Sequence, residues 1–462
     1  MKDGTEKHAV PAVILETDFC SDVDDVGAMA ILFDAAAHGR IRLIGVSVNV
    51  NGPMEAAAAK APEESPAPSL PPAPTPTPVP ELTFPDGSVH RIDETALDLT
   101  RLSHKDVKAT AELLRQMPDL QTVDLGTDGA WTGTPPELTA ETAAQERPET
   151  ATRDLSWADL RMLQEAAPDA EMLYKFCFYG REFTTRDEEM DLNHSPMTDN
   201  GEAVRNILPL MKRCRVLDMD SCGVPSEEMA KIRDAYPEMD VVWRIWFAAD
   251  MFTVRTDIAC LWCANFYPYM WDQYTQELKY CTKLKYLDLG HNLELHDWSF
   301  LEYMPELEVL IITASGWDTL DMLKNCTELE YLEIIPYAHL ELDLHPLAKM
   351  TKLEHLNMCG MGKTEGWEVL LNMPRLKRLW IGRQTAYYFP EGAMEQILEA
   401  LPEAEVFYKE DDGATGRWRH NADGTVPERY LLLRQQFDYD HWQDHAPYPY
   451  NDPLYKPPWE RA

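Results

Sequence analysis

The sequence predicts an α/β fold made of stacked repeats, each with one short strand. One unit, L-x-x-L-x-L, occurs five times in steps of 23, 22, 24 and 23 residues. Apolar and polar residues alternate inside each unit, which is the period of a half-buried strand. Because a single unit cannot bury its own leucines, the copies have to stack against one another. The five copies begin at Leu284, Leu307, Leu329, Leu353 and Leu376.

A second pattern precedes each copy, where cysteine and methionine alternate at one position of the repeat. We expect these side chains to be small apolar members of the core. A complete earlier copy runs from Met117 to Leu125, and partial copies begin at Cys214 and Met239. The array is therefore expected to start soon after residue 83. The alternating position is filled by Cys281, Met304, Cys326, Met350 and Met373.

This spacing and pattern resemble the leucine-rich repeat family over residues 90–408, most regularly over 278–383. The resemblance implies a horseshoe-shaped solenoid with the strands on its concave side and helices or turns on its convex side. Asn292 is the best candidate for the asparagine that family members place after the strand. We expect a repeat domain at 83–408 and an irregular aromatic and proline-rich cap at 409–462.

The interval 243–277 breaks the period and is dense in tryptophan, tyrosine and phenylalanine. Large aromatic side chains at this density usually supply buried apolar area. We therefore favour core packing for this interval over a ligand pocket.

A proline-rich segment separates the repeats from a short head. Residues 61–80 contain nine prolines in twenty positions, which favours the extended polyproline II conformation of a semi-rigid spacer. We expect a head at 1–60 and a linker at 61–82. The head has the pattern of strand, helix and strand at 13–15, 27–37 and 41–48, a single βαβ unit. A unit this short cannot bury enough surface to be stable alone, so the head is expected to be incomplete.

Five acidic residues lie within ten positions after the first strand of the head. Such crowding is unfavourable unless a hard cation or solvent screens it, and oxygen ligands favour Ca²⁺ or Mg²⁺. Residues 12–59 resemble the start of the inosine-uridine preferring nucleoside hydrolases. The resemblance implies that Asp18 is the general base and a Ca²⁺ ligand, that Asp25 is a second ligand and that Asp22 is a further candidate. It also implies ribose contacts by Asp24 and Asn51. A plain solvated turn, or a head joined to the body by gene fusion, remain alternatives.

Composition excludes several classes of function. The 79 acidic and 42 basic side chains give a formal charge of −37, which repels phosphate backbones and argues against nucleic acid as a partner. We find no apolar run long enough for a transmembrane helix and no secretory signal, which as written favours the cytoplasm. The resemblance to bacterial leucine-rich repeat proteins instead suggests a secreted or cell-surface location, so localisation stays open.

The repeats offer a surface rather than a catalytic motif. Non-leucine strand positions are expected to face outward and form two rows, because successive strand residues alternate between faces. Aromatic and polar groups side by side are typical of a recognition face. We predict a binding protein for a protein or other surface ligand, with Ca²⁺-dependent nucleoside hydrolysis by the head as the alternative. The predicted face comprises Tyr286, Asp288, Tyr331, Glu333, His355, Asn357, Arg378 and Trp380.

Overall fold

The computed structural model divides the chain into two compact units, Met1–Thr77 and Pro78–Ala462. It describes residues 12–17, 42–48, 79–129, 138–248, 252–265, 270–337, 340–410 and 417–439. The boundary between the units falls inside the predicted linker, and the second unit already contains the strand β3 (Glu81–Thr83). Strand β3 therefore begins two residues before position 83, and Phe84 directly after it is buried in the core.

The first unit contains two parallel strands, β1 (Ala12–Thr17) and β2 (Arg42–Val48). Both strands of the predicted βαβ unit are thus present and run in the predicted direction. The helix expected at 27–37 lies outside the described residues.

The second unit begins with an antiparallel hairpin of β3 and β4 (Val89–Arg91). A four-stranded sheet follows, made of β5 (Ala96–Asp98), β6 (Thr122–Thr127), β7 (Glu171–Phe178) and β8 (Arg181–Thr184). The first three strands are parallel, whereas β8 returns antiparallel to β7. The helices of this region are the 3-10 helix η1 (His104–Asp106), α2 (Val107–Leu114), α3 (Ala140–Ala143) and α4 (Trp157–Ala166).

The two partial copies then form a separate parallel sheet together with one strand that precedes them. These are β9 (Glu189–Asp191), β10 (Val216–Asp218) and β11 (Asp240–Val242), with β10 in the middle. Helices α5 (Glu202–Ile207) and α6 (Ser226–Ala235) and the 3-10 helix η2 (Leu208–Leu210) connect them. The partial copies at Cys214 and Met239 are therefore real repeats, each with its own strand.

The aromatic interval forms an antiparallel hairpin of β12 (Arg244–Phe247) and β13 (Phe252–Arg255). Trp243, Phe247 and Phe252 are buried core residues, whereas Trp271 and Tyr274 later in the interval are exposed. The preference for core packing over a ligand pocket agrees with this burial.

The regular repeats form one parallel sheet of seven strands. In order these are β14 (Cys260–Trp262), β15 (Tyr286–Asp288), β16 (Val309–Ile311), β17 (Tyr331–Glu333), β19 (His355–Asn357), β21 (Arg378–Trp380) and β22 (Glu405–Phe407). The short strands β18 (Leu342–Asp343) and β20 (Thr364–Glu365) pair beside it.

Helical turns connect the strands of the seven-stranded sheet and stack in the same order as the strands. Successive 3-10 helices from η3 to η7 contact one another, so each repeat packs on the next. These elements are α7 (Asp272–Thr275), η3 (Gln276–Tyr280), η4 (Ser299–Tyr303), η5 (Asp321–Leu323), η6 (His345–Lys349), η7 (Trp367–Asn372), α8 (Gly382–Tyr387) and α9 (Ala393–Ala400).

The core of these repeats follows the sequence pattern closely. The middle leucine of each strand lies in register with the next, as Leu287 pairs with Leu310 and Leu310 with Leu332. All five cysteines and methionines of the alternating position are at most 2% exposed, which confirms them as core residues. Asn292 is also buried, and its Nδ2 donates hydrogen bonds to the carbonyl oxygens of Cys263 and Leu289. It therefore ties neighbouring turns together as expected.

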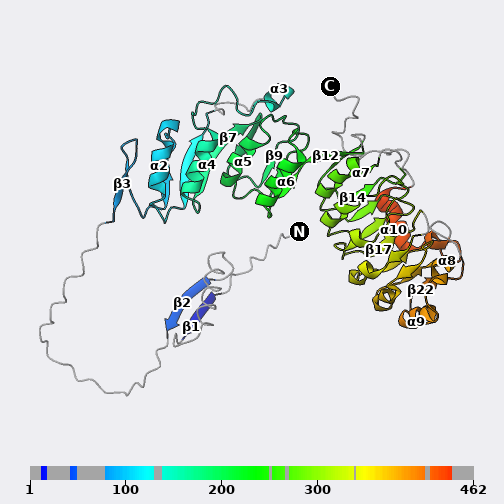
Figure 1. Ribbon diagram of the computed structural model, residues 1–462. Helices are drawn as coiled ribbons and strands as arrows, with labels where there is room; N and C mark the ends of the chain where they lie inside the picture. Colours follow the sequence, from blue (N-terminus) through cyan, green and yellow to red (C-terminus); the bar gives the residue numbers. More distant parts are fainter. Residues whose placement is uncertain are drawn as a thin grey trace, which may run out of the picture. The chain divides into compact units, whose positions relative to one another are not determined.

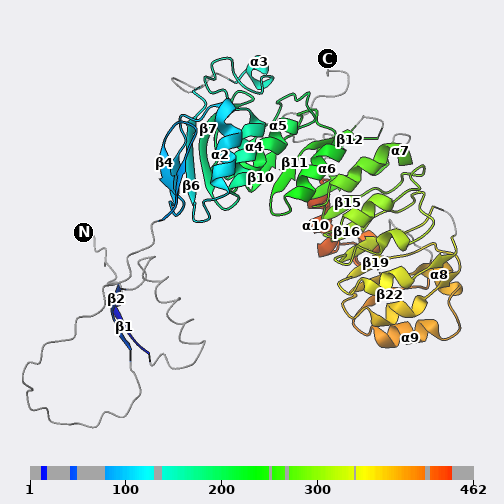
Figure 2. The ribbon, with the colours of Figure 1, turned by 60° about the vertical axis from the view of Figure 1, so that its left-hand side comes forward.

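The chain then returns to the seven-stranded sheet. Residues 417–439, here called the C-terminal segment, contain the 3-10 helix η8 (Arg417–Arg419) and the helix α10 (Glu428–Phe437). Figures 1 and 2 show α10, in orange-red, beside the green strands of this sheet, and the thiol of Cys260 in β14 lies 3.3 Å from the carbonyl oxygen of Gln436. Part of the predicted irregular cap is thus an ordered element laid across the strands.

Candidate functional site: the strand face and its cover

The predicted recognition positions do lie together on one face of the seven-stranded sheet, called here the strand face. Strand register places Tyr286, Val309, Tyr331, His355 and Arg378 in one row. A second, parallel row holds Asp288, Ile311, Glu333, Asn357 and Trp380.

The expectation that this face is open to solvent is wrong. Seven of the eight predicted residues are buried and Tyr286 is half-buried, because the C-terminal segment covers them. Trp418, Leu433 and Phe437 of the segment form an apolar cluster with the strand face that is separate from the repeat core. The predicted face therefore carries a second hydrophobic core instead of a solvated surface. The buried members are Asp288, Tyr331, Glu333, His355, Asn357, Arg378 and Trp380.

Arg378 anchors the start of the segment. Its Nη1 donates to the carbonyl oxygen of Trp418 at 2.7 Å and its Nη2 to that of Arg417 at 3.1 Å. The guanidinium also lies 4.5 Å from the ring centre of Trp380 and forms an ion pair with Glu405. One buried arginine thus binds backbone, ring and carboxylate at the same time.

Glu333 is the centre of the polar contacts. It is fully buried, and its Oε1 accepts hydrogen bonds from Tyr331 Oη at 2.5 Å and from Trp418 Nε1 at 2.7 Å. Arg419 Nη2 lies 3.4 Å from the second carboxylate oxygen and supplies the countercharge. Burial raises the pKa of the Tyr331 hydroxyl well above its usual value, so this group stays a neutral donor.

Asp288 is the second buried carboxylate of the strand face, with 5% of its surface exposed. Its Oδ2 accepts a hydrogen bond from Tyr439 Oη at 2.6 Å, and its Oδ1 accepts one from the backbone N–H of Gly290 at 3.0 Å. Burial raises the pKa of Asp288 to about 6. The segment therefore touches the face at two carboxylates, one at β17 and one at β15.

Several polar atoms at this interface have no hydrogen-bond partner among the described residues. They are His355 Nδ1, Asn357 Nδ2 and Trp380 Nε1 on the face, and Arg419 Nε on the segment. Burial together with the positive charges of Arg429 and Arg378 lowers the pKa of His355 to about 4, so its ring is neutral at pH 7. The segment covers the face but leaves these polar atoms without hydrogen-bond partners among the described residues.

Sequence reasoning missed the residues that cover the strand face. The signal available was weak: Leu433 and Phe437 lie four positions apart, which places them on one side of a helix. Nothing in that spacing indicates which surface the helix covers. The residues that the C-terminal segment contacts lie up to about 150 positions earlier in the chain, as the hydrogen bond between Tyr439 and Asp288 shows.

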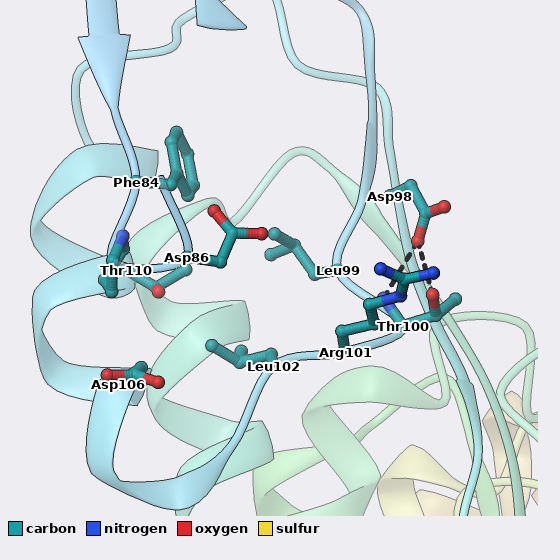
Figure 3. Close-up of a pocket in the computed structure, with 10 residues that line it drawn as sticks. Phe84, Asp86, Asp98, Leu99, Thr100, Arg101, Leu102, Asp106 and Thr110 are labelled. Atoms are coloured by element: carbon teal, nitrogen blue, oxygen red, sulfur yellow. Dashed lines mark hydrogen bonds between the residues drawn. The ribbon is translucent and has the colours of Figure 1, made fainter. Parts of the chain in front are cut away.

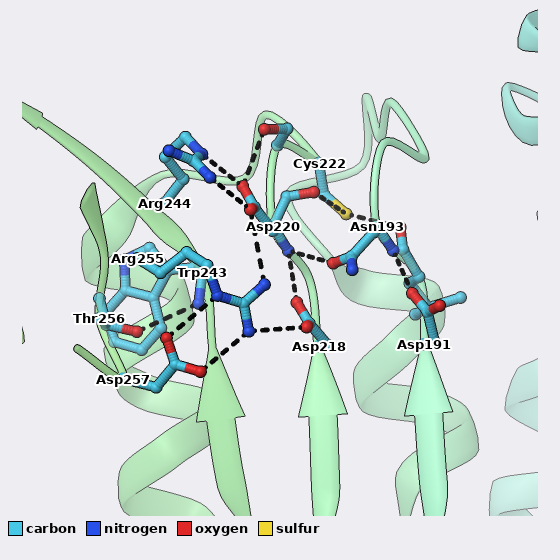
Figure 4. A network of polar contacts seen from close by, with 12 residues as sticks. Asp191, Asn193, Asp218, Asp220, Cys222, Trp243, Arg244, Arg255, Thr256 and Asp257 are labelled. Atoms are coloured by element: carbon cyan, nitrogen blue, oxygen red, sulfur yellow. Dashed lines mark hydrogen bonds and ion pairs between the residues drawn. The ribbon is translucent and has the colours of Figure 1, made fainter. Parts of the chain in front are cut away.

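A second polar site lies between the three-stranded sheet and the aromatic hairpin (Figure 4). Arg244 donates two hydrogen bonds of 2.7 Å to the two carboxylate oxygens of Asp220, and both side chains are buried. Arg255, which faces Arg244 across the hairpin, lies 2.9 Å from Asp218. Burial opposes ionisation of Asp220, but the two arginines hold its pKa below the usual value. The arrangement is a paired structural junction between the two sheets.

A cavity of about 280 Å³ lies at the edge of the second unit, near the first hairpin (Figure 3). Asp86, Asp98 and Asp106 line it, and each accepts hydrogen bonds from a neighbouring serine or threonine. Phe84 and Leu99 supply its apolar wall. These hydrogen bonds join residues only two or three positions apart, unlike the hydrogen bonds between the strand face and the C-terminal segment.

Four of the five acidic residues of the head, Asp18, Asp22, Asp24 and Asp25, lie outside the described residues, as does Asn51, whereas Glu16 belongs to β1. In the part of the chain that the structure describes, no group of three histidine, cysteine or carboxylate side chains could hold a metal ion. No helix in those same ranges is long and apolar enough to span a bilayer.

Comparisons with known proteins do not assign the chain to a family. No family model and no curated protein matches the sequence. Similar solved structures include an internalin of Listeria monocytogenes, at 13% identity and a TM-score of 0.25 over 68% of each chain. A leucine-rich repeat protein of Leptospira interrogans has 14% identity and a TM-score of 0.27, covering 64% of this chain and 92% of its own. Internalin C2 of Listeria monocytogenes has 13% identity and a TM-score of 0.23, and the match covers 62% of this chain and 90% of the internalin.

Identities and TM-scores this low carry no argument about fold or function. The leucine-rich-repeat type of the fold rests on the five sequence copies and on the in-register parallel strands they form. The resemblance of the head to nucleoside hydrolases is not shown by any of these comparisons.

Proposed function

We propose that this protein is a binding module whose strand face recognises a polypeptide segment of a partner. The observation that supports it is the occupant of the face. The chain's own C-terminal segment lies there and buries an aromatic ring, an aliphatic side chain and a helix end. A face that holds one polypeptide through separate anchors has the shape and chemistry to hold another.

The composition of the face supports a polypeptide ligand. Aromatic rings supply contact area and paired charged groups orient the ligand, as in protein interfaces generally. Arg378 binds two backbone carbonyl oxygens of the occupant, a contact that any polypeptide can offer. The buried donors that lack acceptors, on Asn357 and Trp380, leave room for a partner that pairs them better.

Cleavage between the sheet and the segment tests this proposal. A protease site replaces residues 411–416 in the full-length protein, and a fluorescent peptide of residues 417–439 is titrated before and after cleavage. We expect saturable binding to the cleaved protein and much weaker binding to the intact one, because the segment is then free to exchange. The matched control peptide carries Trp418→Ala and should bind at least about tenfold more weakly.

Failure of the peptide to bind the cleaved protein, with the repeats still folded by circular dichroism, would contradict the proposal. Equal binding of the Trp418→Ala peptide would also contradict it, since the segment would then attach without its main anchor.

The calcium and nucleoside assignment of the head stays a separate prediction. Calorimetric titration of the intact protein with Ca²⁺, with an inosine and uridine hydrolysis assay alongside, checks it. The Asp18→Asn variant is expected to lose both signals.

A further inference from the structure

A cavity of about 280 Å³ lies between the strand face and the C-terminal segment. It opens beside the ends of β14, β15 and β16, and the segment supplies one side of it. A volume of this order suits a small metabolite. The polar and aromatic lining residues are Trp262, Asp288, Thr313, Arg419, Tyr430 and Tyr439.

Asp288 lacks a cationic partner among the described residues. Its two hydrogen bonds come from neutral donors, Tyr439 and the backbone of Gly290. Buried carboxylates are normally paired with a positive charge or a metal ion, because ionisation in a low dielectric is otherwise costly. Burial raises the pKa of Asp288 to about 6, and the two hydrogen bonds and the charge of Arg419 offset this effect only in part.

Arg419 presents the complementary deficiency on the same cavity. Its Nη2 faces Glu333 at 3.4 Å, and its guanidinium lies over the ring of Tyr430, 5.3 Å from the ring centre. Its Nε has no acceptor among the described residues, although the atom is buried. The cavity is thus lined by the Asp288 carboxylate on one wall and by the positively charged Arg419 on the other.

We propose that this cavity binds a small zwitterion of the amino-acid type. The ammonium group would pair with Asp288, the carboxylate would accept from the Arg419 guanidinium, and the side chain would lie against Trp262 and Ile311. This ligand is a small molecule and the proposed partner of the strand face is a polypeptide, so the two proposals can fail separately.

Ligands with one charge fit the cavity less well. A simple cation would pair with Asp288 but would leave the Arg419 donor unpaired and face its positive charge. A simple anion would pair with Arg419 but would lie beside the Asp288 carboxylate. A molecule that carries both an ammonium and a carboxylate group pairs with Asp288 and Arg419 at once and adds no net charge to the cavity.

Calorimetric titration of the intact full-length protein tests the proposal with three probes, L-alanine, L-leucine and L-phenylalanine. The amino acid that binds is then compared with its amine and its carboxylic acid, which keep the side chain but lack one charge. We expect each single-charge analogue to bind at least about tenfold more weakly, since each loses one charge-assisted contact.

Two variants locate the binding. Asp288→Asn is expected to weaken amino-acid binding about tenfold or more and to strengthen binding of the carboxylic acid analogue, because it removes the negative charge beside that ligand. Asp343→Asn is the matched control, because Asp343 is exposed and remote from the cavity lining. It should bind as the unaltered protein does.

The proposal would be overturned if none of the three amino acids binds at about 10 mM, because a dissociation constant above that value means negligible affinity. An amine analogue that binds as tightly as its amino acid would also overturn it, because the cavity would then recognise a cation only. These comparisons use the unaltered protein, so they stand even where a variant fails to fold.

Discussion

Two carboxylates on the strand face, Glu333 and Asp288, show how the environment of a single residue decides its role. Glu333 is fully buried and has an arginine beside it, while Asp288 is buried among neutral donors. Removal of charge should therefore have opposite effects at the two positions.

Glu333→Gln is expected to lower the free energy of unfolding by about 2 to 4 kcal/mol, because it leaves Arg419 in a largely buried site without its countercharge. Urea denaturation measures the change. Glu302→Gln serves as the control, since its ion pair with Lys324 lies on the surface and should contribute less than about 1 kcal/mol. Equal effects of the two variants would contradict the assigned role of Glu333.

Asp288→Asn is expected to raise the free energy of unfolding at pH 7.5 by about 1 to 2 kcal/mol. The pKa of Asp288 is raised in the folded protein to about 6 from 3.8, so its contribution is most favourable below pH 4 and is lost as the pH rises through 6. The difference between variant and unaltered protein should therefore shrink at pH 4. A difference that does not change with pH would argue against ionisation as the cause.

At the scale of elements, the strands and their faces could be predicted, but their cover could not. The period of two places Leu287 inward and Asp288 on the opposite face, and local sequence alone determines that. The covering of Asp288 by Tyr439 depends on a contact between residues 151 positions apart. No local pattern specifies such a contact, so the face was expected to be exposed.

Helix α9, which follows the last copy, can be predicted from the sequence, since Ile397 and Leu401 keep a helical spacing. The antiparallel strand β8 and the hairpin β12–β13 were not predicted as such. Each of these strands has only four residues, the shortest run over which alternation predicts a strand.

Helix α10 provides a matched pair of leucines for testing the cover. Leu433 is fully buried, whereas its neighbour Leu432 is 51% exposed. We expect Leu433→Ala to destabilise by about 2 to 4 kcal/mol and Leu432→Ala by less than about 1 kcal/mol. Hydrogen exchange of the α10 amides should rise only in the first variant. Unchanged protection in Leu433→Ala would mean that the helix is held by other contacts.

At the scale of the whole second unit, each repeat packs only against its neighbours. The strands belong to several separate sheets. The junction of Asp220 with Arg244 and Arg255 joins the three-stranded sheet to the hairpin that precedes the seven-stranded sheet. A fully buried ion pair at a break between sheets is a point where unfolding of one part can be separated from unfolding of the other.

Asp220→Ala is expected to lower the free energy of unfolding by about 3 to 5 kcal/mol, because Arg244 stays buried without the carboxylate that pairs with it. Scanning calorimetry should show the unfolding transition broaden or divide in two. Asp257→Asn is the control, since its pair with Arg255 is more exposed, and it should leave one transition. A sharp single transition in Asp220→Ala would show that the junction does not couple the sheets.

The cover over the strand face has a consequence for competition. Only six residues separate Glu410 from Arg417 along the chain, so the segment and its docking face are held at a high local concentration. Short tethers of this kind give effective concentrations of about a millimolar. A free segment with the same intrinsic affinity, present at micromolar concentration, would then occupy about one molecule in a thousand. A natural partner must therefore bind far more tightly than the segment, be displayed at high density, or act after the tether has been cut.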